Sequence, residues 1–478
     1  MFSDVHLGSD IHDGVANKAR RSVAVDRDLV LLLKHYRAQQ PPADRWRIVI
    51  AGDFIDFIGI AIVPTKPDGL LTELNDEERQ HGVGSAVDHA RMKLARVSER
   101  HADVFEALAE FVADGHTLSL VHGNHDIEFH WDAVKDDFRA MLAGHVARLA
   151  RAGTELDVEA FHSRIEFNPW FFYRDGVVYI EHGHQYDPFC ATQNIMSPIS
   201  PFDPRRVARG FCDTLIRFVV RPTRGMKEHG HEHVGVAFYL SFGMQLGASG
   251  MMKLGANFAR AVREMFRLRR GDLSDAAKAL RADHEERVAK LAAVTRLGLD
   301  RLRALLKLQV PPITSSIRGI MASVLLDRLA VGFVSLLALL GILIFGGFHG
   351  RAAWAAGGVV ACWIALHVYF SRQRNVDASE NMVDRAAHLA KLFPAAFVVM
   401  GHTHIPVSMP AGAATTYINV GSWAEEIDEN AVVTEPPAVI DPAYRAARTH
   451  LVIHVRNDRA EAHFCTWEDT GPQPVRPI

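Results

Sequence analysis

The sequence predicts an α/β fold interrupted by a large helical insertion that contains a two-helix transmembrane hairpin. Short apolar runs that end at a glycine and a polar cluster alternate with helical apolar spacing, which is typical of α/β proteins with a site at the carboxyl edge of the sheet. Two long uncharged segments lie in the middle of the chain. We expect residues 1–190 and 391–478 to form one core and residues 191–390 to form the insertion.

The composition indicates a globular protein, because 48% of the 478 residues are hydrophobic and 23% are charged. The net charge of −3 gives no reason to expect a nucleic-acid partner. The four cysteines form no CxxC pair, which favours reduced thiols over a disulfide framework. No basic region followed by an apolar stretch begins the chain, so no cleaved signal peptide is visible.

The first part of the chain predicts a strand, a helix, a second strand and a hairpin. A strand at 48–51 ends at Gly52, and the run "HTLSLV" predicts another that ends before Gly123. Between them, residues 88–115 have helical spacing up to Gly115, which is a suitable helix C-cap. Two apolar runs around Arg174, Asp175 and Gly176 then predict the hairpin. After the insertion, "FPAAFVVM" and "TTYINV" predict two further strands, and residues 450–467 predict a final hairpin.

Two apolar segments, 329–348 and 352–370, carry no charged residue and are each long enough to cross a hydrocarbon core of about 30 Å. The alternative is a helical hairpin buried in a large soluble core. Their outer flanks carry four arginines and their connection carries Arg351 alone, which places both outer ends in the cytoplasm; the four are Arg318, Arg328, Arg372 and Arg374. We therefore expect an inner (cytoplasmic) membrane protein whose remaining parts face the cytoplasm.

The helical residues 253–307, just before the hairpin, contain 14 basic and 7 acidic side chains. This excess has two interpretations that the sequence leaves open. The helices can be ordinary solvated faces, or they can form an amphipathic surface that lies on anionic lipid headgroups.

Five short polar clusters follow predicted strands, and they recur in a fixed order along the chain. Each of them alone is explained by a turn or a helix cap, but five in order at strand ends are not. They are Asp4-Val5-His6, Gly52-Asp53-Phe54-Ile55-Asp56, Gly123-Asn124-His125-Asp126, Glu181-His182-Gly183-His184 and Gly401-His402-Thr403-His404.

The residue types in these clusters suit a pair of divalent metal ions. Two ions about 3.5–4 Å apart need a bridging carboxylate, and they supply an activated hydroxide that attacks phosphorus. Nitrogen and oxygen ligands without thiolate favour Mn²⁺, with Fe or Zn²⁺ as alternatives. A nearby imidazole can protonate the leaving oxygen, and a carboxylate can orient that imidazole.

The five clusters together resemble the calcineurin-like metallophosphoesterase superfamily, whose pattern runs DxH, GDxxD, GNH with Asp or Glu, H, and GHxH. The resemblance covers about 1–190 and 390–470 and implies a four-layer α-β-β-α sandwich. By matching position it implies one metal held by Asp4, His6 and His404, a second held by Asn124, His182 and His402, and Asp53 as the bridge between them. His125 matches the general acid of the family, and Asp56 matches its orienting partner.

The choice between the two histidines of "HGH" rests on the same resemblance. His182 stands at the family's ligand position, so His184 is expected to face the substrate or to support the ligands. Asp126 is likewise expected near the substrate. In the family a strand precedes the DxH loop, whereas only Met1, Phe2 and Ser3 precede Asp4, so we expect the natural chain to begin several residues upstream. The alternative is a frayed first strand with weaker metal binding.

The stretch "EHGHQYDPFC", followed by a helical insertion, resembles the UDP-2,3-diacylglucosamine diphosphatase branch, in which a helical cap over the metals receives acyl chains. The sequence departs from that branch in having His125 instead of Arg and a much longer insertion. The resemblance implies hydrolysis of a phosphate ester or pyrophosphate bond on a lipid-linked or membrane-associated substrate. A membrane-anchored phosphodiesterase for soluble nucleotides and a non-catalytic scaffold of the same fold are the alternatives.

Overall fold

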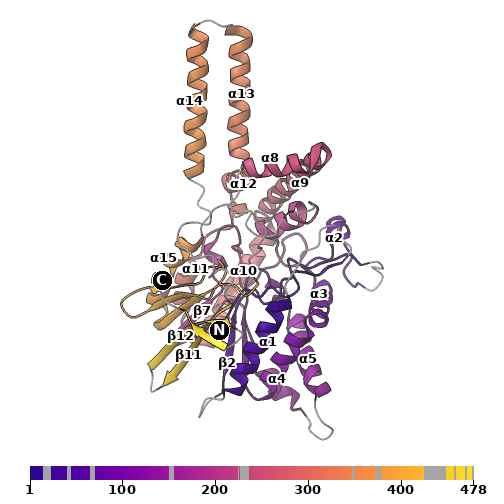
Figure 1. Cartoon of the computed structure of the whole chain (residues 1–478), viewed down its shortest axis with the longest axis vertical. Coiled ribbons are helices and arrows are strands. Elements are labelled where there is room, and N and C mark those ends of the chain that lie inside the picture. The colour runs from indigo at the N-terminus through magenta and orange to yellow at the C-terminus, as the bar shows by residue number, and fades with distance from the viewer. Residues whose placement is uncertain are drawn as a thin grey trace.

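The computed structural model is a mixed α/β structure with parallel sheets and a helical middle region, which confirms the predicted class at that level. Strands from both ends of the sequence lie together in one body, and two long helices extend away from it (Figure 1). The structure describes residues 1–13, 23–39, 45–64, 70–149, 156–223, 226, 236–346, 350–372, 378–424, 448–456, 459–468 and 471–475.

The first sheet is parallel, with the order β2-β4-β5, and its strands are β2 (Arg47–Ala51), β4 (Thr117–Val121) and β5 (Ile165–Asn168). The predicted strand at 48–51 is therefore confirmed. The N-terminal segment runs beside β2 in the same direction, because Phe2 forms a parallel bridge with Ile50 and Leu7 forms one with Ile55. Even the short segment before Asp4 is thus held against the sheet.

The second sheet is mixed, with the order β6-β7-β8-β10-β9. Its strands are β6 (Phe171–Arg174), β7 (Gly176–Glu181), β8 (Ala395–Met400), β10 (Thr416–Asn419) and β9 (Val407–Pro410). β6 and β7 form the predicted hairpin, and Gly176 takes the positive φ of 69° that its turn requires. β7, β8 and β10 are mutually parallel, so the carboxyl ends of β7 and β8 lie at the same edge.

The two sheets face each other through a buried cluster built from alternate strand residues. Val49 and Val121 of the first sheet join Ile180, Val399 and Ile418 of the second in this cluster. Since side chains alternate between the faces of a strand, the intervening residues point to the outer faces. Helices cover the outer face of each sheet, and each of these contacts forms its own buried cluster.

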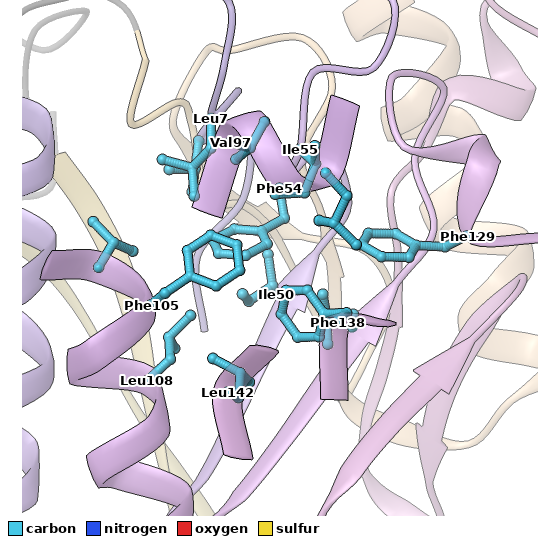
Figure 2. Packing of buried hydrophobic residues seen from close by; sticks show 14 of the residues in the cluster. Leu7, Ile50, Phe54, Ile55, Val97, Phe105, Leu108, Phe129, Phe138 and Leu142 are labelled. Atoms are coloured by element: carbon cyan, nitrogen blue, oxygen red, sulfur yellow. The ribbon is translucent and has the colours of Figure 1, made fainter. Parts of the chain in front are cut away.

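On the outer face of the first sheet, Ile50 packs against Val97, Phe105, Leu108 and Phe138 from three helices (Figure 2). Helices and helical turns in this part of the chain are α1 (Val23–Ala38), α2 (Asp76–His81), α3 (Val87–Arg100), α4 (Ala102–Ala113), α5 (Asp132–Leu149) and α6 (Val158–Ser163). The outer face of the second sheet presents Tyr179, Val398 and Tyr417 to α10 (Asp275–Thr295), α11 (Leu299–Leu306) and α15 (Ala378–Leu392).

The single helix predicted at 88–115 is wrong, because the structure breaks it into α3 and α4 at His101. His101 Nδ1 lies 2.6 Å from Asp26 Oδ2, and Gly8 N donates to His101 Nε2 at 3.1 Å. The break lets this imidazole fix the loop that follows His6. Helical spacing alone does not reveal this requirement, since buried residues of both helices belong to the same core cluster.

The middle region contains α7 (Phe211–Leu215), a π-helical turn (Ile216–Val220), α8 (Val236–Gln245), α9 (Gly247–Asp272), α12 (Ile317–Ser323), α13 (Leu326–Gly346) and α14 (Gly350–Arg372). The segments Leu326–Phe345 and Gly350–Phe370 are long and apolar enough to cross a membrane, and neither is buried in the structure. α13 and α14 stand side by side away from the body (Figure 1). The alternative of a hairpin buried in the core is therefore wrong.

The helices of this hairpin begin slightly earlier than predicted, at Leu326 and Gly350 instead of 329 and 352. The last two residues of the predicted segment 329–348 lie outside the described residues. The predicted C-terminal hairpin is confirmed as β11 (Arg448–Arg456) and β12 (Arg459–Glu468), to which the structure adds β13 (Gly471–Pro474). A small parallel pair joins β1 (His12–Asp13) and β3 (Ala61–Ile62).

Candidate metal centre

The predicted site residues lie on loops that leave the carboxyl ends of parallel strands. Asp53 and Asp56 follow β2, and Asn124 and His125 follow β4. His182 follows β7, while His402 and His404 follow β8. Asp4 and His6 follow the segment that Phe2 pairs to β2. Parallel strands end at the same edge, so the two sheets bring loops from five parts of the sequence together.

The backbone at this edge is strained at the predicted ligands. Seven non-glycine residues of the described part of the chain have positive φ, and five of them are Asp4 (52°), His6 (49°), Asp53 (53°), His402 (68°) and His404 (60°). Such conformations cost about 1–3 kcal/mol each and concentrate at functional sites. Backbone hydrogen bonds from Asp4 N to Gly52 O (3.1 Å) and from His6 N to Asp53 O (3.0 Å) support them.

Two glycines are required by the closeness of these loops. A Cβ on Gly52 would lie 2.4 Å from His182 Nδ1, and one on Gly123 would lie 2.0 Å from Asp53 Oδ1. Gly52 also has a φ of 91°. The Gly-Asp and Gly-Asn steps of the sequence therefore exist because these ligand loops pack directly on one another.

One group of candidate ligands comprises Asp4, His6 and His404, whose ligand atoms all lie within 4.8 Å of one another. Asp4 Oδ1 lies 3.1 Å from His404 Nε2 and 3.8 Å from His6 Nε2. The other oxygen, Oδ2, accepts hydrogen bonds from Ser3 Oγ (2.5 Å) and from His402 N (3.1 Å). The protein thus fixes one oxygen of Asp4 and turns the other toward two imidazoles.

A second group, also within 4.8 Å, comprises Asp4, Asp53 and His182. Asp53 Oδ2 lies 3.1 Å from His182 Nε2 and 3.8 Å from His6 Nε2. Asp53 Oδ1 accepts a hydrogen bond from His125 N at 2.8 Å. Asp53 is therefore placed between the His6 side and the His182 side of the cluster, where the predicted bridge is required.

The surroundings of His182 test whether a cation fits there. Its Nδ1 lies 2.8 Å from Ala51 O, which only accepts, so Nδ1 carries a proton. Nε2 of the neutral ring then holds a lone pair, yet it faces Asp53 Oδ2 at 3.1 Å and Asn124 Oδ1 at 3.2 Å. Three acceptors at this spacing need a cation among them, either a proton on Nε2 or a metal ion.

The pKa values of the cluster residues also indicate that positive charge is favoured here. Burial by itself would lower the pKa of His6, but Asp4, Asp56 and Asp53 raise it to about 10. Burial likewise opposes protonation of His182, whose pKa the charges of Asp53 and Asp4 raise to about 9. The pKa values of Asp4 and Asp53 stay below the ordinary value despite burial, because His182 and neighbouring imidazoles are close. The donor set holds positive charge tightly, so the residues present fit metal ions.

His125 and Asp56 form a buried pair beside this cluster, with Nδ1 and Oδ1 separated by 2.6 Å. Burial would lower the pKa of His125, but the charges of Asp56 and Asp53 raise it. The second oxygen of Asp56 lies 3.8 Å from His6 Nδ1. The imidazole that the sequence assigns to proton transfer is thus oriented by the carboxylate assigned to orient it.

His402 is the predicted ligand that the structure places differently. Its ring centroid lies 5.2 Å from that of His182, but its Nε2 lies 3.0 Å from Asp187 Oδ2. Asp187, Cys190 and His402 form a ligand group of their own within 4.8 Å. Sequence reasoning missed Asp187, although it belongs to the quoted stretch "HGHQYDPFC", five residues after His182.

The two residues assigned to substrate contact are both buried. His184 Nε2 lies 2.9 Å from Gln185 Nε2, and burial followed by the charge of His182 lowers the pKa of His184 well below its ordinary value. The carboxylate of Asp126 accepts hydrogen bonds from Gly123 N (2.6 Å) and Phe54 N (2.9 Å), which ties two ligand loops together. Their contact with substrate stays a prediction.

A cavity of about 690 Å³ opens next to Asn124. One wall comes from the core, including Phe57, Lys93 and Glu128, and the other comes from Cys190 and residues of the helical middle region. The charged side chains around it are largely paired, as in Arg206 with Glu78 (2.7 Å) and Arg217 with Glu77.

The fold and this cluster define an α/β protein with buried His/Asp groups that can hold metal ions. In comparisons with known proteins, no family model, no curated protein and no solved structure matched the chain. The resemblance seen in the five clusters therefore rests on the residues and on their placement.

Proposed function

We propose that this protein is a metal-dependent phosphoesterase of the calcineurin-like type, which hydrolyses a phosphate ester or pyrophosphate bond. The observation that carries the proposal is the convergence of four buried residues, Asp4, Asp53, His6 and His182, with the half-buried His404. Two facing sheets with helices on both outer faces support it, because the family's four-layer sandwich has that arrangement. The division at 190 and 391 into core, insertion and core is part of the proposal.

In this proposal Asp4, His6 and His404 hold one ion, Asn124 and His182 hold the second with His402, and Asp53 lies between them. A pair of divalent ions, proposed to be Mn²⁺ with Fe or Zn²⁺ as alternatives, would supply Lewis acidity and would lower the pKa of water enough to provide hydroxide as the nucleophile at neutral pH. The chain supplies the geometry, since the fixed second oxygens of Asp4 and Asp53 leave one oxygen each for the ions.

His125 is proposed to donate a proton to the leaving oxygen. Its Nδ1 lies 2.6 Å from Asp56 Oδ1, so the proton transfer is assigned to Nε2. Burial would lower the pKa of His125, but the charges of Asp56 and Asp53 raise it, which favours the protonated form that a proton donor needs. Nearly complete burial excludes bulk water from both partners.

The proposed substrate is lipid-linked or membrane-associated, and the proposed location is the inner (cytoplasmic) membrane with the site on the cytoplasmic side. The exposed hairpin α13–α14 and the arginines on its outer flanks support this proposal. Moving the acyl chain of an amphiphile from the bilayer into water costs about 0.8 kcal/mol per methylene. An enzyme tethered to the membrane avoids this cost by binding the head group at the membrane surface.

A hydrolysis screen tests the proposal. The full-length chain in detergent is stripped with a chelator, reloaded with Mn²⁺, Fe²⁺ or Zn²⁺, and assayed on aryl phosphate mono- and diesters, nucleoside diphosphates and lipid pyrophosphates. We expect metal-dependent turnover that Asp53→Asn abolishes and that Asp175→Asn, an exposed hairpin residue, leaves unchanged. The proposal is contradicted if the protein binds no metal, or if it binds metal and hydrolyses none of these compounds. Either result would favour the non-catalytic scaffold.

One observation favours the second candidate, a membrane-anchored phosphodiesterase for soluble nucleotides. The cavity beside Asn124 is bordered by paired charged groups such as Arg206–Glu78, which suit a polar substrate better than an acyl chain. The same screen separates the two candidates, because a soluble nucleotide that is turned over faster than any lipid substrate supports this one.

A further inference from the structure

A second ligand cluster lies at the edge of the candidate metal centre, and it differs in chemistry from the first. Asp187, Cys190 and His402 place a carboxylate oxygen, a sulfur and an imidazole nitrogen within 4.8 Å of one another. Asp187 Oδ2 and His402 Nε2 are 3.0 Å apart. All three residues are half-buried, so their ligand atoms are reachable and are partly shielded from water.

A second thiol stands beside this group. Cys212 of α7 has its sulfur 3.2 Å from that of Cys190, although the two residues are 22 positions apart in the sequence. Both are thiols in this structure, and both border the cavity next to Asn124. This proximity could not be predicted from the sequence, because the cysteines form no CxxC motif.

The turn that carries the cluster is already ordered. Asp187 Oδ1 accepts a hydrogen bond from Phe189 N at 2.8 Å, which leaves Oδ2 directed toward His402. Cys190 N donates to Asp187 O at 3.1 Å, so Asp187 and Cys190 sit at the two ends of one tight turn. Second hydrogen bonds of this kind orient ligands in protein metal sites.

We propose that Asp187, Cys190, Cys212 and His402 form a binding site for a soft divalent metal ion such as Zn²⁺, separate from the phosphoesterase pair. Thiolate, imidazole and carboxylate ligands together select Zn²⁺ over Mn²⁺ or Mg²⁺. In a tetrahedral site with Zn–S of about 2.3 Å, the two sulfurs lie about 3.8 Å apart. The thiols need to separate by only about half an ångström from their distance in the structure to reach that spacing.

The site has a regulatory consequence, which rests on the proposed function. The proposed function assigns His402 to the second ion, while the structure groups it with Asp187 and Cys190, and an imidazole Nε2 can bind one ion at a time. A soft metal on Asp187 and the thiols therefore holds His402 away from Asn124 and His182. We expect Zn²⁺ or Cd²⁺ to inhibit Mn²⁺-dependent turnover through this site.

The test uses spectroscopy, so it does not depend on any phosphoesterase activity. The full-length, reduced chain in detergent, loaded with Mn²⁺, is titrated with Co²⁺ and separately with Cd²⁺. We expect a thiolate-to-metal charge-transfer band that saturates at one equivalent. Cys190→Ser should weaken this binding at least about 10-fold and remove most of the band, and Cys212→Ser should reduce the band by about half. Cys362→Ser, in α14, is the matched thiol control and should change nothing.

Retained Mn²⁺ content in each variant shows that it is folded. A wild-type chain with reduced thiols and no charge-transfer band overturns the proposal, as does an equal band in Cys190→Ser. A Cys190–Cys212 disulfide found by mass spectrometry under non-reducing conditions, together with no metal binding after reduction, overturns it as well. If the band is present and no compound is hydrolysed, the soft-metal site stands and the proposed function fails.

Discussion

Replacing Asp56 with Asn removes one charge from the His125–Asp56 pair and keeps its shape. Asp56 Oδ1 lies 2.6 Å from His125 Nδ1, both groups are buried, and the charge of Asp56 raises the pKa of the imidazole. A hydrogen bond to a charged partner is worth about 1.5–3 kcal/mol, against about 0.5–1.5 for a neutral one. The substitution therefore costs about 1–1.5 kcal/mol, or roughly 5- to 13-fold in kcat/KM.

The sign of the accompanying pH effect follows from the same charge. The folded-state pKa of His125 is raised by Asp56, so Asp56→Asn lowers it and the protonated acid is lost at a lower pH. The alkaline limb of the kcat/KM profile should move to lower pH. The assay is that profile on a soluble aryl phosphodiester at saturating Mn²⁺, with metal content measured in parallel because Asp56 Oδ2 also lies 3.8 Å from His6 Nδ1.

The double variant provides the decisive comparison. His125→Ala should lower the rate about 10²–10⁴-fold with metal retained. Since Asp56 is argued to act through His125, adding Asp56→Asn to His125→Ala should change the rate by less than about 2-fold. Equal losses in both backgrounds, with unchanged metal content, would refute the assignment of Asp56 as the positioning residue for a proton donor.

Four further predictions follow from the structure. Asp53→Asn should remove both metal ions and all metal-dependent turnover, as measured by elemental analysis and hydrolysis. His404→Ala should remove the ion of its own group and leave the metal content at about half. In the metal-free protein, the pKa values of about 10 for His6 and about 9 for His182 mean that their protonated forms stabilise the fold. That stabilisation is fully present below about pH 6.5 and is lost as the pH rises through 9 to 10, so the Tm of chelated protein should fall there while Mn²⁺-loaded protein keeps its Tm. An alkaline fall of equal size in both forms would show that the two imidazoles do not face the ions. Leu339→Asp in α13 should cost about 2.5–3.5 kcal/mol of membrane insertion and reduce the membrane fraction of the chain in a flotation assay, with Leu339→Met as the control. Unchanged flotation would show that α13 does not span a bilayer.

The loops that form the candidate site could be predicted from the sequence, because each of them has a recognisable local pattern of an apolar run followed by polar residues. Gly52-Asp53 and Gly123-Asn124 each end a short apolar run, and the close packing of these loops explains both glycines. Features that depend on contacts with distant parts of the chain were not predicted. The helix break at His101 exists to reach Asp26 and Gly8, which are 75 and 93 residues away. A periodic pattern contains no information about partners so distant.

The same limit explains why Asp187, the neighbour of His402 in the structure, was missed. The assignment of His402 came from its position within "GHTH", which fixes where its backbone lies, and that much agrees with the structure, since His402 N donates to Asp4 Oδ2 at 3.1 Å. The direction of its ring depends on Asp187, whose own position depends on the turn to Cys190.

A backbone held at a φ of 68° leaves His402 little freedom except rotation of the side chain. If both proposed sites exist, rotation of the His402 imidazole would move it from one to the other, and the bound metal would determine which site it completes.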